Sequence, residues 1–96
     1  MVMKVHLQIL LPMLSQAMGS KELQIEFARE TVGGLIEHLI ARYGRKARHA
    51  LYDEGGELDP MLQILLNGEQ WIAHDQLDTP LRDGDDVILM MMMGGG

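Results

Sequence analysis

The spacing of apolar residues changes at Thr31, and this change constrains the fold more than any other feature of the sequence. Before Thr31, apolar and polar residues alternate over residues 3–11 and 23–27. A period of two is typical of strands with one buried face. After Thr31 the period is helical, with one apolar stripe made of Val32, Leu35, Ile36, Leu39, Ile40 and Tyr43. The sequence therefore predicts a strand hairpin followed by a helix that buries one face.

The residues at the ends of this helix fit its expected limits, 31–43. Thr31 is a suitable N-cap, and Gly44 suits the position just after the last turn. Gly33 and Gly34 are unusual so early in a helix, because each costs roughly 1 kcal/mol relative to alanine. Two explanations remain open: another backbone approaches closely there, or the first turn simply tolerates them.

The rest of the chain alternates between strand and turn patterns. Residues 15–20 are expected to form a loop, and residues 45–60, which show no period, a mobile connector. Strands are predicted at 61–66 and 69–72, joined by the hairpin signal Asn67-Gly68. A second tight turn at 82–85 precedes a last strand at about 87–92. One helix among such strands must cover one face of a mixed sheet, so the predicted class is α+β.

Composition and charge exclude several functions. The chain lacks cysteine, which excludes a thiol nucleophile and a thiolate metal site and fits a reducing compartment. No apolar run approaches a membrane span, so we expect a cytoplasmic protein without membrane partners. Residues 1–52 carry a charge of +3 and residues 53–96 a charge of −9. The acidic half disfavours nucleic acid and favours a basic partner protein.

No pattern of catalytic or metal-binding residues emerges. The four histidines lack the spacing of a zinc site, so we interpret them as solvated. They are His6, His38, His49 and His74. Asp83, Asp85 and Asp86 fit a tight turn better than a calcium loop. Trp71 is expected to cover the sheet edge, with partner contact as the alternative.

The sequence ends in Gly94, Gly95 and Gly96, directly after the apolar residues 87–93. Glycine loses the most backbone entropy on ordering, so such a run does not hold a fold together. It does offer a backbone thin enough to enter a narrow slot. We therefore expect a domain over residues 1–93 and a flexible tail over residues 94–96.

Three stretches, in this order, resemble the ubiquitin-like β-grasp sulfur carriers. They are residues 31–36 (TVGGLI), 65–69 (LLNGE) and 81–88 (LRDGDDVI) with the terminal glycines. That family includes the small subunit of molybdopterin synthase, the thiamine-pathway sulfur carrier and the ubiquitin-related modifiers. The resemblance implies a β-grasp fold, in which one main helix packs on one face of a mixed sheet.

The resemblance also implies a function without catalysis by this chain. A ubiquitin-activating-like adenylyltransferase would use ATP and magnesium to adenylate the carboxylate of Gly96. A sulfur donor would then form a thiocarboxylate, and Gly94 and Gly95 would allow the tail to enter the partner. The thiocarboxylate would donate sulfur in cofactor biosynthesis, with molybdopterin favoured and the large subunit of a synthase as a further partner. No cofactor or metal would be bound by the chain itself.

The sequence departs from the family pattern at its end. It has three terminal glycines rather than two, and four methionines at 90–93 replace the usual branched and proline residues. Methionine adapts to irregular grooves, but the simpler interpretation is the end of a core strand, with Met90 buried. Two alternatives to a sulfur carrier stay open. One is a modifier joined to lysines of target proteins, and the other is a β-grasp interaction module that is never activated.

Overall fold

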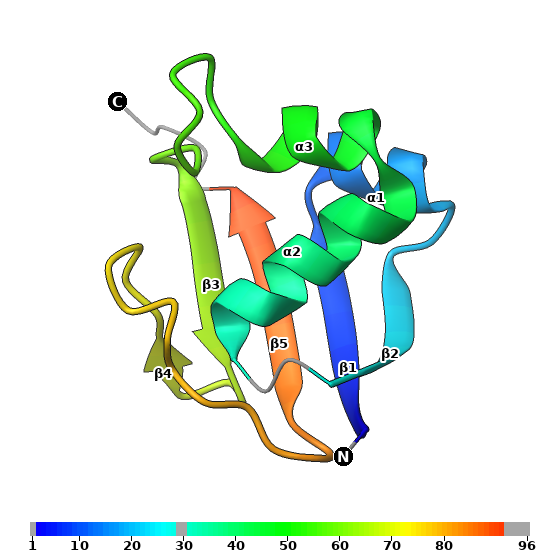
Figure 1. Cartoon of the computed structure of the whole chain (residues 1–96), viewed down its shortest axis with the longest axis vertical. Coiled ribbons are helices and arrows are strands. Elements are labelled where there is room, and N and C mark those ends of the chain that lie inside the picture. Colours follow the sequence, from blue (N-terminus) through cyan, green and yellow to red (C-terminus); the bar gives the residue numbers. More distant parts are fainter. Residues whose placement is uncertain (1, 29–30, 92–96) are drawn as a thin grey trace.

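Five strands form a mixed sheet in the computed structural model, which describes residues 2–28 and 31–91. In chain order they are β1 (Met3–Leu10), β2 (Glu22–Phe27), β3 (Leu62–Leu66), β4 (Gln70–Trp71) and β5 (Asp86–Met91). Their order across the sheet is β2-β1-β5-β3-β4. β1 and β5 run parallel, whereas the other neighbours are antiparallel (Figure 1). Both predicted hairpins are confirmed, and β5 lies between them.

The main helix, α2 (Val32–Tyr43), crosses one face of this sheet (Figure 1). Its predicted stripe is confirmed, since Leu35, Ile36 and Leu39 are fully buried and Ile40 is half-buried. The alternating segments contribute their apolar residues to the same core, among them Val5, Leu7, Ile25 and Phe27. Thr31 caps the helix, because its Oγ1 accepts a hydrogen bond of 3.0 Å from the Gly34 amide.

Gly33, at the start of α2, allows a loop to approach closely. The Gly33 amide donates to the Leu77 carbonyl at 2.8 Å, and the Val32 amide donates to the Thr79 carbonyl at 3.0 Å. A Cβ at Gly33 would lie 3.1 Å from the Leu77 oxygen and 3.3 Å from its Cβ. The first of the two explanations therefore holds for Gly33. The loop satisfies amides that the first turn of a helix otherwise leaves without partners.

Two short helices replace segments expected to be irregular. α1 (Pro12–Met18) starts with proline at its first position and ends at Gly19 in the left-handed region, with φ 75°. The expectation of a loop at 15–20 was therefore wrong. α3 (Arg45–Leu51) buries Ala47, Ala50 and Leu51, so the connector expected at 45–60 was wrong over this segment. Alanine supplies a small buried stripe that hydrophobic period alone does not reveal.

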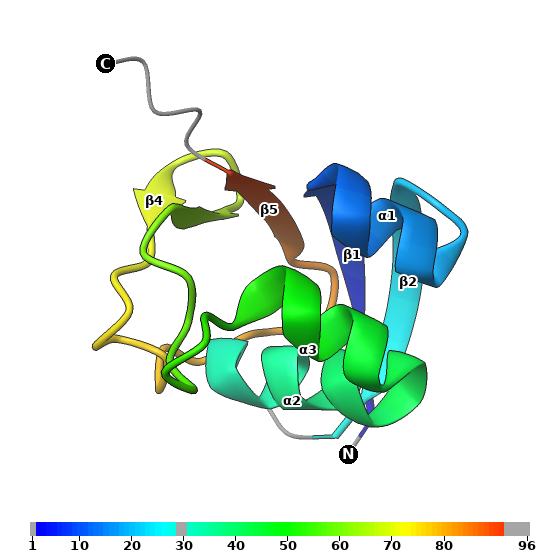
Figure 2. The ribbon, with the colours of Figure 1, turned by 90° about the horizontal axis from the view of Figure 1, so that it is seen from above.

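The helices leave one face of the sheet uncovered. Figure 2 shows α2 and α3 on one side of the sheet, and α1 at the end where β1 finishes. Among the described residues, no helix is long and apolar enough to cross a membrane.

Candidate functional site

The strand that leads to the terminal glycines is held on both sides. β5 pairs with β1 from His6↔Asp86 to Leu10↔Met90, and with β3 from Leu66↔Val87 to Leu62↔Met91. Val87 and Leu89 point into the core and are 1% and 0% exposed. Because two neighbours and the core fix this strand, the chain leaves Met91 from a defined point. Gly94, Gly95 and Gly96, with the tail expected there, lie outside the described residues.

The first methionines of the run form the end of β5, as expected, but a different methionine faces the core. Alternation along β5 places Met91, not Met90, on the side of the core, where it packs against the buried cluster. Met90 is half-buried on the opposite face, together with Ile88. The expectation that Met90 is a core residue was therefore wrong by one position, which in a strand reverses the face. Met92 and Met93 lie outside the described residues.

Apolar side chains from four strands share the face that the helices leave uncovered. The strand register places them next to one another, because Leu10 pairs with Met90, and Leu65 pairs with both Ile88 and Trp71. Leu10 is 50% exposed and Trp71 is 56% exposed, whereas the other three are half-buried. We call this set the apolar sheet face: Leu10, Leu65, Trp71, Ile88 and Met90. An exposed apolar patch of this kind marks an interaction site.

The turn before β5 is hydrogen-bonded to the β3–β4 turn, so two of the sequence stretches that suggested the family lie in contact. Asn67 and Gly68 have φ 54° and 70°, as a two-residue hairpin turn requires. The Asn67 side chain accepts a hydrogen bond from the Asp86 amide at 2.8 Å and donates one to Asp85 at 3.1 Å. Asp83 accepts from the Lys4 amide at 2.7 Å. Turn chemistry thus explains Asp83 and Asp85, as predicted, whereas Asp86 belongs to β5 and its carboxylate contacts His6.

His6 joins three strands on the same uncovered face. Its Nδ1 lies 2.6 Å from Asp86 on β5, and its Nε2 lies 2.6 Å from Glu22 on β2. The hydrogen bond to Asp86, assisted by Glu22 and opposed by partial burial, raises the pKa of His6. Both ring nitrogens can then donate as an imidazolium, which forms a charged bridge across β2, β1 and β5.

The interpretation of all four histidines as solvated was therefore wrong for at least two of them. His6 forms the bridge between two carboxylates, and His74 Nε2 donates to the Leu62 carbonyl at 2.8 Å. The described residues contain no cluster of three or more potential metal ligands.

Comparison with known proteins adds a decisive observation. The sequence model of the ThiS family matches residues 14–96, most of the chain. The chain belongs to the ThiS family. The match includes α2, the β3–β4 hairpin, β5 and the terminal glycines, so all three stretches that carried the resemblance lie inside it.

Relatives of this ThiS-family chain include both carriers and modifiers. A protein of Archaeoglobus fulgidus assigned as a sulfur carrier is 29% identical over 83 residues, which cover 86% of this chain and 93% of the relative. Small archaeal modifier protein 3 of Haloferax volcanii is 35% identical over 66 residues, covering 69% and 70% of the two chains. The chain is thus related to small proteins of both kinds.

Solved structures confirm the ubiquitin-like β-grasp fold. Small archaeal modifier protein 1 of Methanosarcina acetivorans aligns with a TM-score of 0.77 at 25% identity, over 100% of this chain and 99% of that one. A chain of the BexX/CysO complex of Amycolatopsis orientalis aligns with a TM-score of 0.68 at 24% identity, over 96% and 99%. The expected fold class, with one main helix on a mixed sheet, is therefore correct.

Sequence reasoning singled out the tail but missed most of the apolar sheet face. Trp71 and, as part of the methionine run, Met90 were considered for partner contact, whereas Leu10, Leu65 and Ile88 were not. A signal was present, because β3 and β5 carry apolar residues at consecutive positions, as in LQILL and DVILMM. In a domain with one helical layer, the second apolar side of such strands must face outward.

Proposed function

We propose that this chain is a sulfur carrier whose Gly96 carboxylate is adenylated by a ubiquitin-activating-like adenylyltransferase. That partner would use ATP and magnesium, and a sulfur donor would convert the acyl-adenylate to a thiocarboxylate. One observation carries the proposal: the central strand β5 ends beside an uncovered apolar face and leads to the terminal glycines. A partner that binds this face would find the tail leaving from a fixed place.

The residues of the tail suit this chemistry. A carboxylate is unreactive towards nucleophiles, whereas an acyl-phosphate anhydride exposes its carbonyl carbon to attack. Glycine at position 96 places no side chain beside that carbon, and Gly94 and Gly95 let the backbone enter a narrow channel. From Met91 to Gly96 the extended chain spans about 20 Å, enough to reach from the sheet to a buried ATP site.

For the pathway served we propose molybdopterin biosynthesis, in which the large subunit of a synthase would bind the same face and present the sulfur acceptor. The BexX/CysO complex shows that a chain of this fold occurs in a complex with a second protein. The chain itself would supply the reacting carboxylate and the docking surface, and its partners would supply the catalytic groups.

The test is an intact-mass measurement after incubation with the activating enzyme, ATP, magnesium and a sulfur donor. We expect one oxygen of the chain to be replaced by sulfur. Trp71→Ala should lower the rate by weakening docking, whereas Met13→Ala should not, because Met13 is similarly exposed but lies on α1. Unmodified mass under all conditions would exclude a carrier and leave an interaction module.

A modifier is the second candidate, supported by the similarity to small archaeal modifier protein 3. Its signature would be an isopeptide bond between Gly96 and lysines of other proteins. Mass spectrometry of tryptic digests from cells that produce the chain separates the two functions. Lysine adducts with the C-terminal sequence of this chain would show a modifier, and a thiocarboxylate without adducts would show a carrier alone.

A further inference from the structure

The β1 side of the β5 ladder ends at a proline. In a parallel pair, every second residue of a strand directs its backbone groups at the neighbour. The His6 amide donates to the Asp85 carbonyl at 2.9 Å, so on β1 these are the even-numbered residues. The backbone stays extended through Leu11, with φ −110° and ψ 109°, and the next even-numbered residue is Pro12. Because proline has no N–H, it cannot donate to the Met91 carbonyl.

The β3 side of the ladder ends at an amide that is already bonded. In an antiparallel pair, alternate residues exchange hydrogen bonds with the neighbour. The Asn67 amide donates to the Asp86 carbonyl at 2.7 Å, so on β3 the odd-numbered residues bond to β5. The next odd-numbered residue before β3 begins is Met61, whose amide donates to Asp59 Oδ1 at 2.9 Å. The carboxylate of Asp59 therefore occupies the donor that a longer β5 would need.

Pro12 and Met61 stand opposite the same position of the chain. The register that pairs Leu10 with Met90 sets Pro12 opposite residue 92. The register that pairs Gln63 with Met90 sets Met61 opposite residue 92 as well. Figure 1 shows β5 ending at this level, at the end of the sheet where α1 begins. Neither of these two residues offers a free N–H one position beyond the last residue of β5.

The backbone holds Asp59 in its place. Its amide donates to the Leu51 carbonyl at 2.9 Å, and its carbonyl accepts from the Leu62 amide at 2.9 Å. These bonds join the end of α3 to the start of β3 and fix the carboxylate beside the Met61 amide. An aspartate followed by Pro60 suits a turn, and local structure explains that hydrogen bond alone. It does not explain why the ladder lacks a donor on both sides of β5 at the same level.

We propose that Pro12 and Asp59 are positioning residues, which end the sheet at Met91 and so leave the tail available to a partner. Their role in the reaction rests on the proposed function, in which the tail must reach an ATP site. Each residue added to β5 would shorten that reach by about 3.3 Å. Pairing of Met92 and Met93 would remove about a third of it.

The first measurement needs no partner enzyme. Amide exchange and the heteronuclear NOE of the ¹⁵N-labelled full chain report on Met92 directly, and we expect fast exchange in the unmodified chain. Asp59→Ala frees the Met61 amide, and Pro12→Ala adds an amide opposite the Met91 carbonyl. The double variant should therefore slow exchange at Met92 about fivefold or more and raise its NOE.

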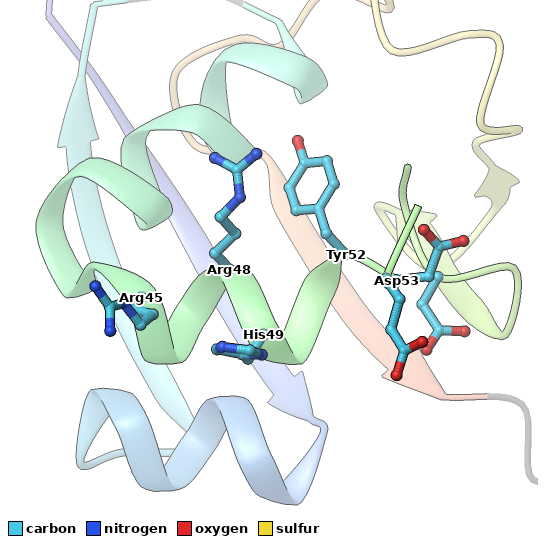
Figure 3. A pocket seen from close by; sticks show the side chains of 7 residues that line it. Arg45, Arg48, His49, Tyr52 and Asp53 are labelled. Carbon is cyan, nitrogen blue, oxygen red and sulfur yellow. The ribbon is translucent and has the colours of Figure 1, made fainter. Parts of the chain in front are cut away.

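Two further variants separate this role from the folding of the loop. Asp59→Asn keeps an Oδ1 that accepts from the Met61 amide, so exchange at Met92 should stay fast. Asp53→Ala is the matched control, because Asp53 also accepts from two amides of its own loop, at 2.9 and 3.1 Å, but neither belongs to β3. Figure 3 shows Asp53 just after Tyr52, at the end of α3. Its replacement should leave Met92 unchanged.

The second measurement is adenylation by the activating enzyme, followed as ATP–pyrophosphate exchange. The double variant should lower kcat about threefold or more, with KM for the chain nearly unchanged, because the apolar sheet face is intact and only the tail is held back. Asp59→Asn and Asp53→Ala should keep the kcat of the unmodified chain. Thermal melts show whether each variant folds, and Asp59→Ala alone serves both measurements if the double variant does not.

Slow exchange at Met92 in the unmodified chain would overturn the proposal, and so would unchanged exchange in Asp59→Ala and the double variant. An unchanged kcat despite slower exchange would disprove the role in the reaction. If the unmodified chain is not adenylated at all, the proposed function fails. Exchange at Met92 then still decides whether Pro12 and Asp59 end the sheet.

Discussion

Replacing Leu39 with alanine tests the packing of α2 on the sheet. Leu39 is 0% exposed and belongs to the single buried cluster formed by the described residues. Losing its three outer carbons removes roughly 2.4 kcal/mol of transfer free energy, at about 0.8 kcal/mol per carbon. The cavity left behind brings the total to about 3–5 kcal/mol. For a domain of this size each kcal/mol lowers Tm by about 4–8 °C, so we expect a decrease of at least about 12 °C.

The assay is urea unfolding followed by far-UV circular dichroism, with thermal melts as a second measurement. Leu10→Ala is the matched control, because Leu10 is 50% exposed on the uncovered face and leaves no closed cavity. It should cost about 1 kcal/mol or less. A loss below about 1 kcal/mol for Leu39→Ala, or equal losses for the two variants, would refute the packing described above.

Three further predictions concern other parts of the chain. Because the pKa of His6 is raised, the stability from its bridge is complete below the unfolded-state pKa and is lost as pH rises through the folded-state pKa. In urea unfolding between pH 6 and pH 9, the free energy of unfolding of the unmodified chain should therefore exceed that of His6→Gln by an amount that decreases as pH rises. A difference that stays constant would contradict the bridge. Gly33→Ala should destabilise the domain by about 1 kcal/mol, although alanine has the better helix propensity, because the Leu77 carbonyl must move. Increased stability in the same assay would show that the loop around Leu77 moves aside without cost. Deleting Gly95 and Gly96 should leave Tm within about 1 °C but abolish adenylation, measured as ATP–pyrophosphate exchange; loss of folding, or retained exchange, would disprove the role given to the tail.

Hydrophobic period predicted the elements that bury large side chains on one face. The stripe of α2 and the alternation in β1 are strong signals because Leu, Ile and Val occupy most of the inward positions. α3 was missed because two of its three buried residues are alanines, which carry little hydrophobic signal. α1 was missed although it begins with Pro12, and proline is favoured at the first position of a helix.

The apolar sheet face depends on which strands become neighbours, and the sequence does not state this directly. Leu10 and Met90 are 80 positions apart, yet the parallel pairing of β1 and β5 places them side by side. Likewise, the bridge from His6 to Asp86 and Glu22 requires the strand order β2-β1-β5. Periodicity assigns a residue to a face, whereas register and strand order decide which residues meet on it.

The central position of β5 has a consequence for the synthesis of this protein. The strand order β2-β1-β5-β3-β4 means that β5 alone joins the two hairpins. It is also the last of these strands to leave the ribosome, and it pairs with the first. Until it emerges, Leu10 and Leu65 belong to separate hairpins, and two-stranded hairpins are marginally stable in water. A truncated nascent chain therefore cannot display a continuous apolar sheet face, so a partner that recognises this face would select completed chains.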